Sequence, residues 1–221
     1  MTRWVWPQHR FADPVLRAHG CGASAMLAAL VRASDGGWRP KGRAGTTSAL
    51  FRVRASGVAP GRFRSRGLTA SEVWRSLDAV HATDERMGLR AQVRHGVDVL
   101  GDLLPQLARI DGCACVAVDY GVIRRAGLGG RGSYRGGHWV LVGDPGDGRV
   151  DVADSLRERL VTWPVDVLAD AMASFGARPW GHGRGEAVVV WPWRTWREGY
   201  ETVRGQRDEA RADLAACRAQ A

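Results

Sequence analysis

The chain has 221 residues, of which 45% are hydrophobic and 25% charged; these values are typical of one globular domain with an appendage and exclude a disordered or fibrous protein. Its formal charge of +9 favours anionic partners such as nucleic acid, membrane surfaces or cell-wall polymers. The sequence has no apolar run near the ~18 residues of a membrane span and no export signal, so we expect synthesis in the cytoplasm and no membrane span.

The first predicted helix covers residues 23–33, which are rich in alanine and other good helix formers. Gly20, Cys21 and Gly22 precede it directly, so we expect Cys21 at or near a helix N-terminus. In that position the helix dipole lowers the pKa of a thiol, and backbone N–H groups can stabilise an oxyanion. A cysteine before a helix, taken alone, is more often structural than reactive.

A basic, glycine-rich stretch follows at residues 38–66, and we expect a solvated loop there. Nucleic acid is not an expected partner, because the stretch lacks the interleaved stacking aromatics of a recognisable binding module. Thr69 and Glu72 then form a capping box that predicts a helix through about residue 80, with Trp74 and Leu77 on its buried face.

The middle of the chain predicts a strand at residues 89–93, a helix at 98–110 bent by Pro105, and a buried strand at 113–118. Cys113 and Cys115 share one face of that strand and are expected to be core residues. The four cysteines show no Cys-x-x-Cys pair, so we expect neither a disulfide scaffold nor a zinc site. A loop with six glycines follows at residues 127–137.

His138 opens the next predicted strand, residues 139–142. Turn-forming residues at 144–148 lead into a returning strand at 149–153, which delivers Asp154 at its end. Because the start of one strand lies beside the end of the other in such a hairpin, we expect the side chains of His138 and Asp154 to meet. Together with Cys21, they supply a nucleophile, a general base and a residue that orients the base.

The remaining predictions are a helix at 165–175 and a strand at 187–191, after which the main domain, residues 1–193, ends. Residues 194–221 are predicted to form a helix with heptad spacing from Trp196 to Cys217, interrupted only by Arg207. This helix either packs back on the domain or docks to a protein partner as a coiled coil. The other histidines are interpreted as structural or surface residues: His9, His81, His95 and His182.

Three segments carry a resemblance to a known family: Cys-Gly-x-Ser-x-Met-x-x-x-Leu at 21–30, Gly-His-Trp-Val-Leu-Val at 137–142 and Val-Asp-Val-Ala-Asp at 150–154. They resemble the bacteriocin-processing (double-glycine leader) peptidase-like branch of the papain-like cysteine peptidases, over residues 14–155. The resemblance implies an α+β fold in which an N-terminal helix carrying the cysteine packs on an antiparallel sheet. It also implies a Cys21, His138 and Asp154 triad with no metal and no organic cofactor.

The sequence departs from this family at one position. Relatives usually place a glutamine six residues before the cysteine, where its side chain donates to the oxyanion, but this chain has Val15 there. Loss of one such donor typically costs a hydrolase ~2.7–4 kcal/mol of transition-state stabilisation. Gln8 and His19 are the candidate replacements, Gln8 only if the N-terminal segment folds back over the cleft.

We therefore expect a cysteine peptidase or amidase. The resemblance, the arginine and alanine bias and the positive charge favour peptidoglycan stem peptides as the substrate of a phage-type lysin or virion tail-associated wall hydrolase. Two alternatives stay open. A transglutaminase-like acyl transferase uses the same order of cysteine, histidine and aspartate, and Val15 favours a non-catalytic structural or adaptor protein of a virion that keeps the fold.

Overall fold

The computed structural model describes residues 5–11, 13–34, 68–83, 89–130, 133–177 and 185–192. The basic stretch at 38–66 and the heptad segment at 196–217 lie outside these residues. The elements, in chain order, are η1 (Gln8–Arg10), α1 (Pro14–His19), α2 (Cys21–Ala33), α4 (Ala70–Thr83), β1 (Leu89–His95), the π-helical turn η3 (Val99–Leu103), α5 (Leu104–Ile110), β2 (Cys113–Asp119), α6 (Tyr120–Arg125), β3 (Gly137–Gly146), β4 (Arg149–Ala153), β5 (Val161–Pro164), α7 (Val165–Gly176) and β6 (Glu186–Pro192).

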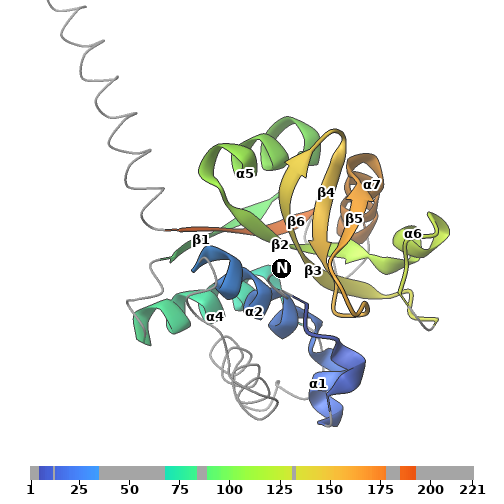
Figure 1. Cartoon of the computed structure of the whole chain (residues 1–221), viewed down its shortest axis with the longest axis horizontal. Helices are drawn as coiled ribbons and strands as arrows, with labels where there is room; N and C mark the ends of the chain where they lie inside the picture. Colours follow the sequence, from blue (N-terminus) through green and yellow to red (C-terminus); the bar gives the residue numbers. More distant parts are fainter. Residues whose placement is uncertain are drawn as a thin grey trace, which may run out of the picture.

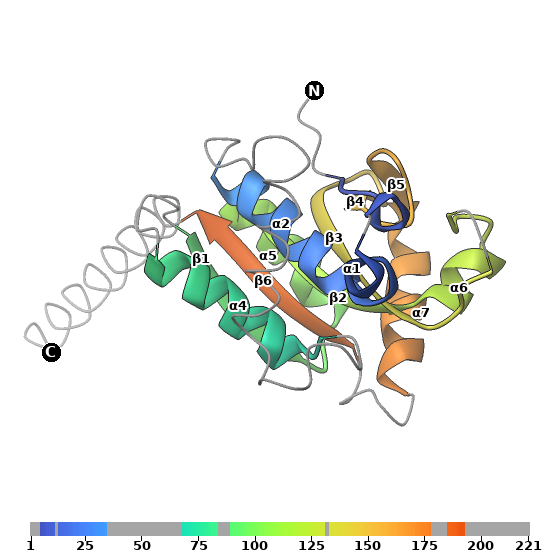
Figure 2. The same ribbon diagram turned by 90° about the horizontal axis from the view of Figure 1, so that it is seen from below.

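The predicted α+β class is confirmed: one six-stranded antiparallel sheet, in the order β1-β6-β2-β3-β4-β5, lies between two layers of helices. Figure 1 shows α2 and α4 together below the sheet and α5 above it. In the view from below, α4 lies alongside β1 and β6, while α1 lies near the end of α2 (Figure 2). No helix among the residues described is long and apolar enough to cross a bilayer.

Strand β2 lies in the middle of the sheet and is buried along its whole length. Cys113 and Cys115 face the core cluster that contains α2, whereas Val116 and Val118 face the cluster that contains α7. Burial raises the pKa of Cys113 to about 12 and that of Cys115 well above its ordinary value. Both thiols are therefore unreactive core residues, as predicted.

The capping box at the start of α4 is confirmed, because the backbone N–H and hydroxyl of Thr69 both donate to Oε2 of Glu72. Leu77 is fully buried, as predicted. The prediction for Trp74 is wrong: its side chain is 37% exposed, and its indole N–H reaches across to donate to the carbonyl of Ala91 in the edge strand β1. An indole at the edge of a helix face can remain partly exposed to solvent when its N–H is hydrogen-bonded to such an acceptor.

The hairpin of β3 and β4 is tighter than predicted. Its two-residue turn is Asp147 and Gly148, both with positive φ (48° and 70°), and a register shift follows Gly143 in β3. This is the backbone geometry that two-residue hairpins favour. The ladder pairs Leu141 with Ala153, so its continuation puts Asp154 opposite Val140 and diagonal to His138 rather than directly facing it.

Contacts at both ends of helix α2 fix its position on the sheet. At its C-terminal end, Arg32 donates to Oδ1 of Asp111 and Oδ1 of Asp144, at 2.8 and 2.7 Å. At its N-terminal end, Gly20 passes so close to α1 that a Cβ there would lie 2.2 Å from the carbonyl oxygen of Leu16. The rise from Cys21 to Arg32 is about 16 Å at ~1.5 Å per residue, which is about half the length of the ten-residue strand β3 at ~3.3 Å per residue.

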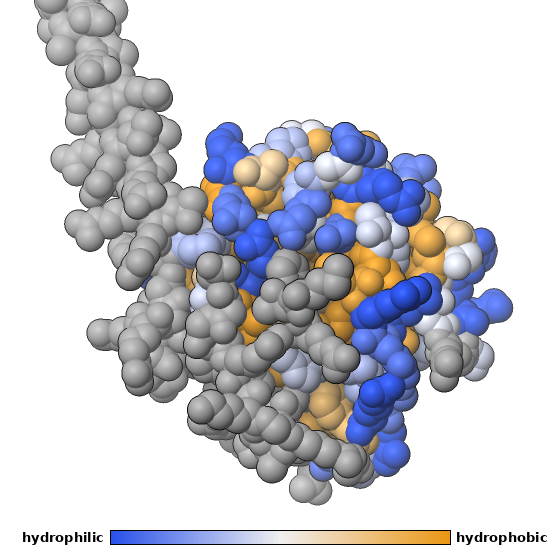
Figure 3. Space-filling model, viewed as in Figure 1, coloured by the Kyte–Doolittle hydropathy of each residue, from blue (hydrophilic) through white to orange (hydrophobic). Residues whose placement is uncertain are grey.

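Short helix α1 packs through Leu16, which is completely buried. Its other side faces solvent, and Figure 3 shows hydrophilic residues gathered over it. Asp13 caps the helix by accepting from the backbone N–H of Leu16 at 2.9 Å. The sequence analysis did not predict α1, α6 or β5, all of which have six residues or fewer.

Candidate active site

Cys21, His138 and Asp154 come together at one end of the sheet. Cys21 is the first residue of α2, His138 is the second residue of β3, and Asp154 directly follows β4. Nε2 of His138 lies 2.9 Å from Oδ1 of Asp154, and the same imidazole is hydrogen-bonded to the Cys21 thiol. Since Nε2 is engaged by the carboxylate, Nδ1 is the ring nitrogen left for sulfur.

All three side chains are buried, with exposed fractions of 8% for Cys21, 2% for His138 and 0% for Asp154. Burial by itself raises the pKa of the Cys21 thiol. The hydrogen bond and charge of His138 outweigh it, with help from the backbone N–H groups of Trp139 and Gly22, so the pKa is lowered. A lowered pKa increases the thiolate fraction near neutral pH, and the thiolate is the nucleophile.

The pKa of His138 is shifted in the opposite direction. Burial lowers it, but the hydrogen bonds and charges of Asp154 and Cys21 dominate and raise it to about 10. The arrangement therefore favours a thiolate and imidazolium pair at neutral pH. In that state the proton already resides on His138 before any substrate carbonyl is attacked.

Asp154 is held by three donors. Besides His138, the backbone N–H of Leu156 donates to Oδ1 at 2.8 Å, and the hydroxyl of Tyr120 donates to Oδ2 at 2.7 Å. Burial raises the pKa of Asp154, but these hydrogen bonds and the charge of His138 lower it overall. The carboxylate thus stays ionised although no part of it reaches solvent.

Tyr120 connects this carboxylate to the glycine-rich loop. Its hydroxyl accepts from the backbone N–H of Gly130 at 2.7 Å while donating to Asp154. Its ring also meets the His138 ring edge-on, with centroids 4.9 Å apart. Burial and the charge of Asp154 raise the pKa of Tyr120, so its hydroxyl remains a proton donor.

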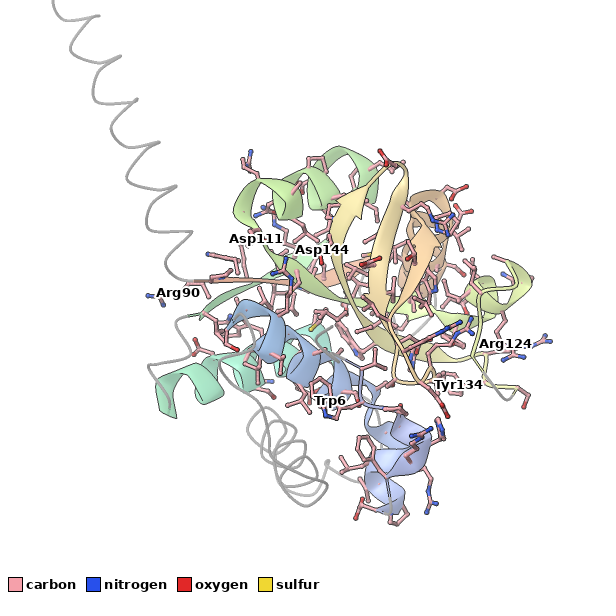
Figure 4. The ribbon with its side chains drawn as sticks, in the orientation of Figure 1. Trp6, Arg90, Asp111, Arg124, Tyr134 and Asp144 are labelled. Atoms are coloured by element: carbon pink, nitrogen blue, oxygen red, sulfur yellow. The ribbon has the colours of Figure 1, made fainter. Side chains whose placement is uncertain are left out.

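The glycines of the loop permit this approach. A Cβ at Gly130 would lie 2.4 Å from the carbonyl oxygen of Leu156, so only glycine fits between Tyr120 and the chain after Asp154. Tyr134 from the same loop lies at the exposed side, with its ring centroid 6.0 Å from that of His138. Figure 4 shows Tyr134 at the opposite end of the sheet from Asp111 and Asp144.

The N-terminal segment does fold back to the site. Gln8 is 95% buried: its backbone N–H donates to the carbonyl of Ser155 at 2.7 Å, and its Oε1 accepts from the Ser155 hydroxyl at 3.1 Å. Its amide nitrogen donates to the carbonyl of Arg17 at 2.7 Å. Gln8 thereby links α1 to Ser155, the residue after Asp154. The second N–H of its side-chain amide is not used in these hydrogen bonds.

The other two positions of interest lie in α1. Val15 is the second residue of the helix and is partly buried, and His19 ends the helix two residues before Cys21. The structure places Gln8 and His19 near the N-terminal end of α2, but their role as oxyanion donors stays a prediction. The helix itself offers an alternative, because its first backbone hydrogen bond is from Ser24 to Gly20, which leaves earlier N–H groups without a helical acceptor.

The sequence analysis missed Tyr120 and the anchoring role of Gln8. A signal for Tyr120 existed: it directly follows the predicted strand 113–118, and pairing that strand antiparallel with 139–142 places Tyr120 at the histidine end. Among the other histidines, His9 lies 3.6 Å from Glu158 and His95 lies 3.8 Å from Glu186, both at the surface. His81 and His182 lie where side chains are not described.

Comparison with known proteins gives no independent assignment: no family model matches the chain, and no curated protein matches it. Within the described part of the chain, no three histidine, cysteine, aspartate or glutamate side chains gather closely enough to hold a metal ion. The chemistry that the arrangement can support therefore follows from its own residues. They form a buried thiol with a lowered pKa, an imidazole that holds its proton, and a carboxylate that fixes the imidazole.

Proposed function

We propose that this protein is a papain-like cysteine peptidase or amidase that uses Cys21, His138 and Asp154. The observation that carries the proposal is the hydrogen-bonded chain from the Cys21 thiol through the His138 ring to Asp154. These residues come from three separate elements, α2, β3 and the end of β4. A cysteine needed only for packing has no requirement for an imidazole and a buried carboxylate behind it.

In the proposed reaction, the Cys21 thiolate attacks the carbonyl carbon of an amide, and a C–S bond forms. His138 gives its proton to the departing nitrogen as the C–N bond breaks, which leaves a thioester on Cys21 and a free amine. His138 then takes a proton from water, whose oxygen attacks the thioester. The carboxylic acid leaves and Cys21 is restored.

Asp154 keeps Nε2 of His138 engaged throughout, so that the imidazole can neither rotate nor change tautomer. The negative oxygen that develops on the carbonyl needs donors, and the N–H groups at the start of α2, which have no acceptor within the helix, are the best placed. Gln8 and His19 are the side-chain candidates. The half-buried Val15 supplies no donor. This missing donor is the main support for the alternative, a non-catalytic adaptor protein of a virion.

For the substrate we propose the stem peptides of peptidoglycan. The net charge of +9 supports an anionic polymer, because a positive field raises the local concentration of such a substrate and speeds encounter. The same thioester would give a cross-link if an amine replaced water, which is the transglutaminase alternative. The substrate proposal rests on charge and resemblance, and the hydrolytic proposal on the site.

Digestion of purified peptidoglycan tests both the hydrolytic activity and the choice of substrate. We expect the wild-type protein to release free amines and Cys21→Ala to release none, while Ser34→Ala, a change at the far end of α2, leaves the release intact. Equal release by wild type and Cys21→Ala would refute the wall-hydrolase proposal. Incorporation of an added primary amine without release of soluble peptide would instead identify an acyl transferase, and no thioester on Cys21 with any amide substrate would favour the adaptor.

A further inference from the structure

A cavity lies at the same end of the sheet as the triad but two strands away from β3. Its volume is about 260 Å³, and it is lined by Thr69, Ala70 and Ser71 at the start of α4, by His95 at the end of β1 and by Glu186 at the start of β6. None of these residues belongs to the triad or to its hydrogen-bond partners. Ser71 and His95 are exposed and form the rim, whereas Glu186 lies at the inner wall.

Glu186 is the unusual member of this set. It is 3% exposed, and its Oε1 has no hydrogen-bond partner anywhere in the part of the chain that the structure describes. Among the described residues, a basic group lies within 4 Å of this oxygen only at Nδ1 of His95, at 3.8 Å, which is too long for a hydrogen bond and attractive only when that exposed histidine is protonated. A buried carboxylate oxygen without a donor is costly, so the position calls for one from outside.

The start of α4 does not provide that donor. The two donors of the capping residue Thr69 are already used, because its backbone N–H and its hydroxyl both donate to Oε2 of Glu72 in the first turn. Glu72 therefore supplies the negative charge that a helix N-terminus favours. Glu186 is a second buried carboxylate, on the wall that faces the start of α4, and its Oε1 still lacks a donor among the described residues.

The register of the sheet fixes where this cavity lies relative to the triad. Ala187 of β6 pairs with Val116 of β2, and Ala117 pairs with Trp139 of β3. Continuing the ladder by one residue puts Glu186 in the same row as Trp139, the neighbour of His138. Two strand spacings of ~4.8 Å then separate the backbone of Glu186 from that of Trp139 by about 10 Å, which an extended peptide crosses in about three residues.

We propose that this cavity is a substrate subsite that binds a primary ammonium group, two or three residues from the scissile bond, against the carboxylate of Glu186. The proposal rests on the proposed peptidase function and adds a substrate class to it: peptides with a lysine-like side chain at that distance. The ammonium donates to Oε1 of Glu186, and its methylene stem lies along Ala70 at the cavity wall. A neutral side chain of the same length would leave Oε1 unpartnered.

Thiol–disulfide exchange tests this without a known substrate. The probes are capped alanine peptides with a central cysteine activated as a 2-thiopyridyl disulfide, and with lysine or norleucine at each position from one to four residues on either side. The Cys21 thiolate displaces pyridine-2-thione, whose absorbance gives the rate, and mass spectrometry assigns the product to Cys21. The rate of alkylation by iodoacetamide, a reagent that needs no subsite, measures the reactivity of the Cys21 thiol alone.

We expect lysine to react at least about tenfold faster than norleucine, a difference of ~1.4 kcal/mol, at a position two or three residues away on one side. Glu186→Gln should reduce that ratio to about one and leave the iodoacetamide rate unchanged. Asp147→Asn, which removes one negative charge from the exposed turn at the other end of β3, should keep the preference. Ser71→Lys, at the exposed rim, should reduce it by placing a competing ammonium at the mouth.

The two proposals fail in different ways. Slow iodoacetamide reaction of the folded wild-type protein would overturn the peptidase function itself. Fast iodoacetamide reaction with equal lysine and norleucine rates at every position would overturn the subsite alone. A lysine preference that survives in Glu186→Gln would show that another carboxylate carries it.

Discussion

Replacing Tyr120 by phenylalanine removes one oxygen atom from the centre of the site. That oxygen donates to Oδ2 of Asp154 and accepts from the N–H of Gly130, both at 2.7 Å, and the whole tyrosine is buried. The change thus leaves a buried carboxylate oxygen and a buried amide without their partners. Phenylalanine fills the same space otherwise, so no cavity larger than the oxygen is created.

A hydrogen bond to a charged group is worth ~1.5–3 kcal/mol, and a buried N–H left unpaired costs ~1–3 kcal/mol. Since the two losses share one atom and the loop can relax, we expect Tyr120→Phe to lower the free energy of unfolding by about 2–4 kcal/mol. With one fewer donor, Asp154 also holds His138 less firmly. We expect the alkylation rate of Cys21 at pH 7 to fall by about tenfold, equivalent to ~1.4 kcal/mol.

Urea denaturation and site-resolved alkylation measure the two effects, and Tyr134→Phe is the matched control. Tyr134 is 46% exposed, and its hydroxyl donates to the carbonyl of Gly137 at the surface. Its loss should change stability by no more than about 0.5 kcal/mol. If Tyr120→Phe unfolds at the same urea concentration as wild type and alkylates at the same rate, then the tyrosine neither supports the loop nor positions the aspartate.

Three further outcomes follow from the contacts of the site. Gly20→Ala should destabilise the protein markedly in urea, because its Cβ would meet a backbone oxygen at 2.2 Å, whereas Gly146→Ala, with open space around it, should not. Asp154→Asn should lower the pKa of His138, measurable by NMR titration, since the charge that raises it is gone; an unchanged pKa would contradict the coupling. Because the pKa of His138 is raised from 6.5 to about 10, its stabilising charge is fully present below pH 6.5 and lost as pH rises through about 10. The stability difference between wild type and His138→Ala should shrink over that range, and a difference that grows with pH would refute the assignment.

Several parts of the fold follow from local sequence signals. The capping box at Thr69, the alanine-rich run after Cys21, and the Asp-Gly turn between β3 and β4 each specify backbone geometry within a few residues. The hairpin also brings His138 and Asp154 close, although the structure sets them diagonally rather than opposite each other. The two side chains still form their hydrogen bond, because long side chains reach diagonal neighbours on adjacent strands.

Other parts depend on contacts that no local pattern encodes. Strand β6 comes last among the described elements yet inserts between β1 and β2, so the sheet order is set by long-range pairing. The short helices α1 and α6 show too few turns for a periodic signal, even though Asp13 and Pro14 mark the start of α1. Gln8 meets Ser155 across 147 positions and Tyr120 meets Asp154 across 34, and such contacts appear only once the chain is folded.

The central claim is that His138 activates Cys21, and the pH dependence of Cys21 alkylation tests it most directly. Iodoacetamide rates are measured across pH for wild type and His138→Ala, with mass spectrometry isolating Cys21 from the other cysteines. We predict a wild-type midpoint clearly below the ordinary thiol pKa of 9.0, moved to 9.0 or above in His138→Ala because burial, the largest influence, is then opposed only by the backbone N–H groups of Trp139 and Gly22. A wild-type midpoint at or above 9.0, or one that His138→Ala does not move, would contradict the account.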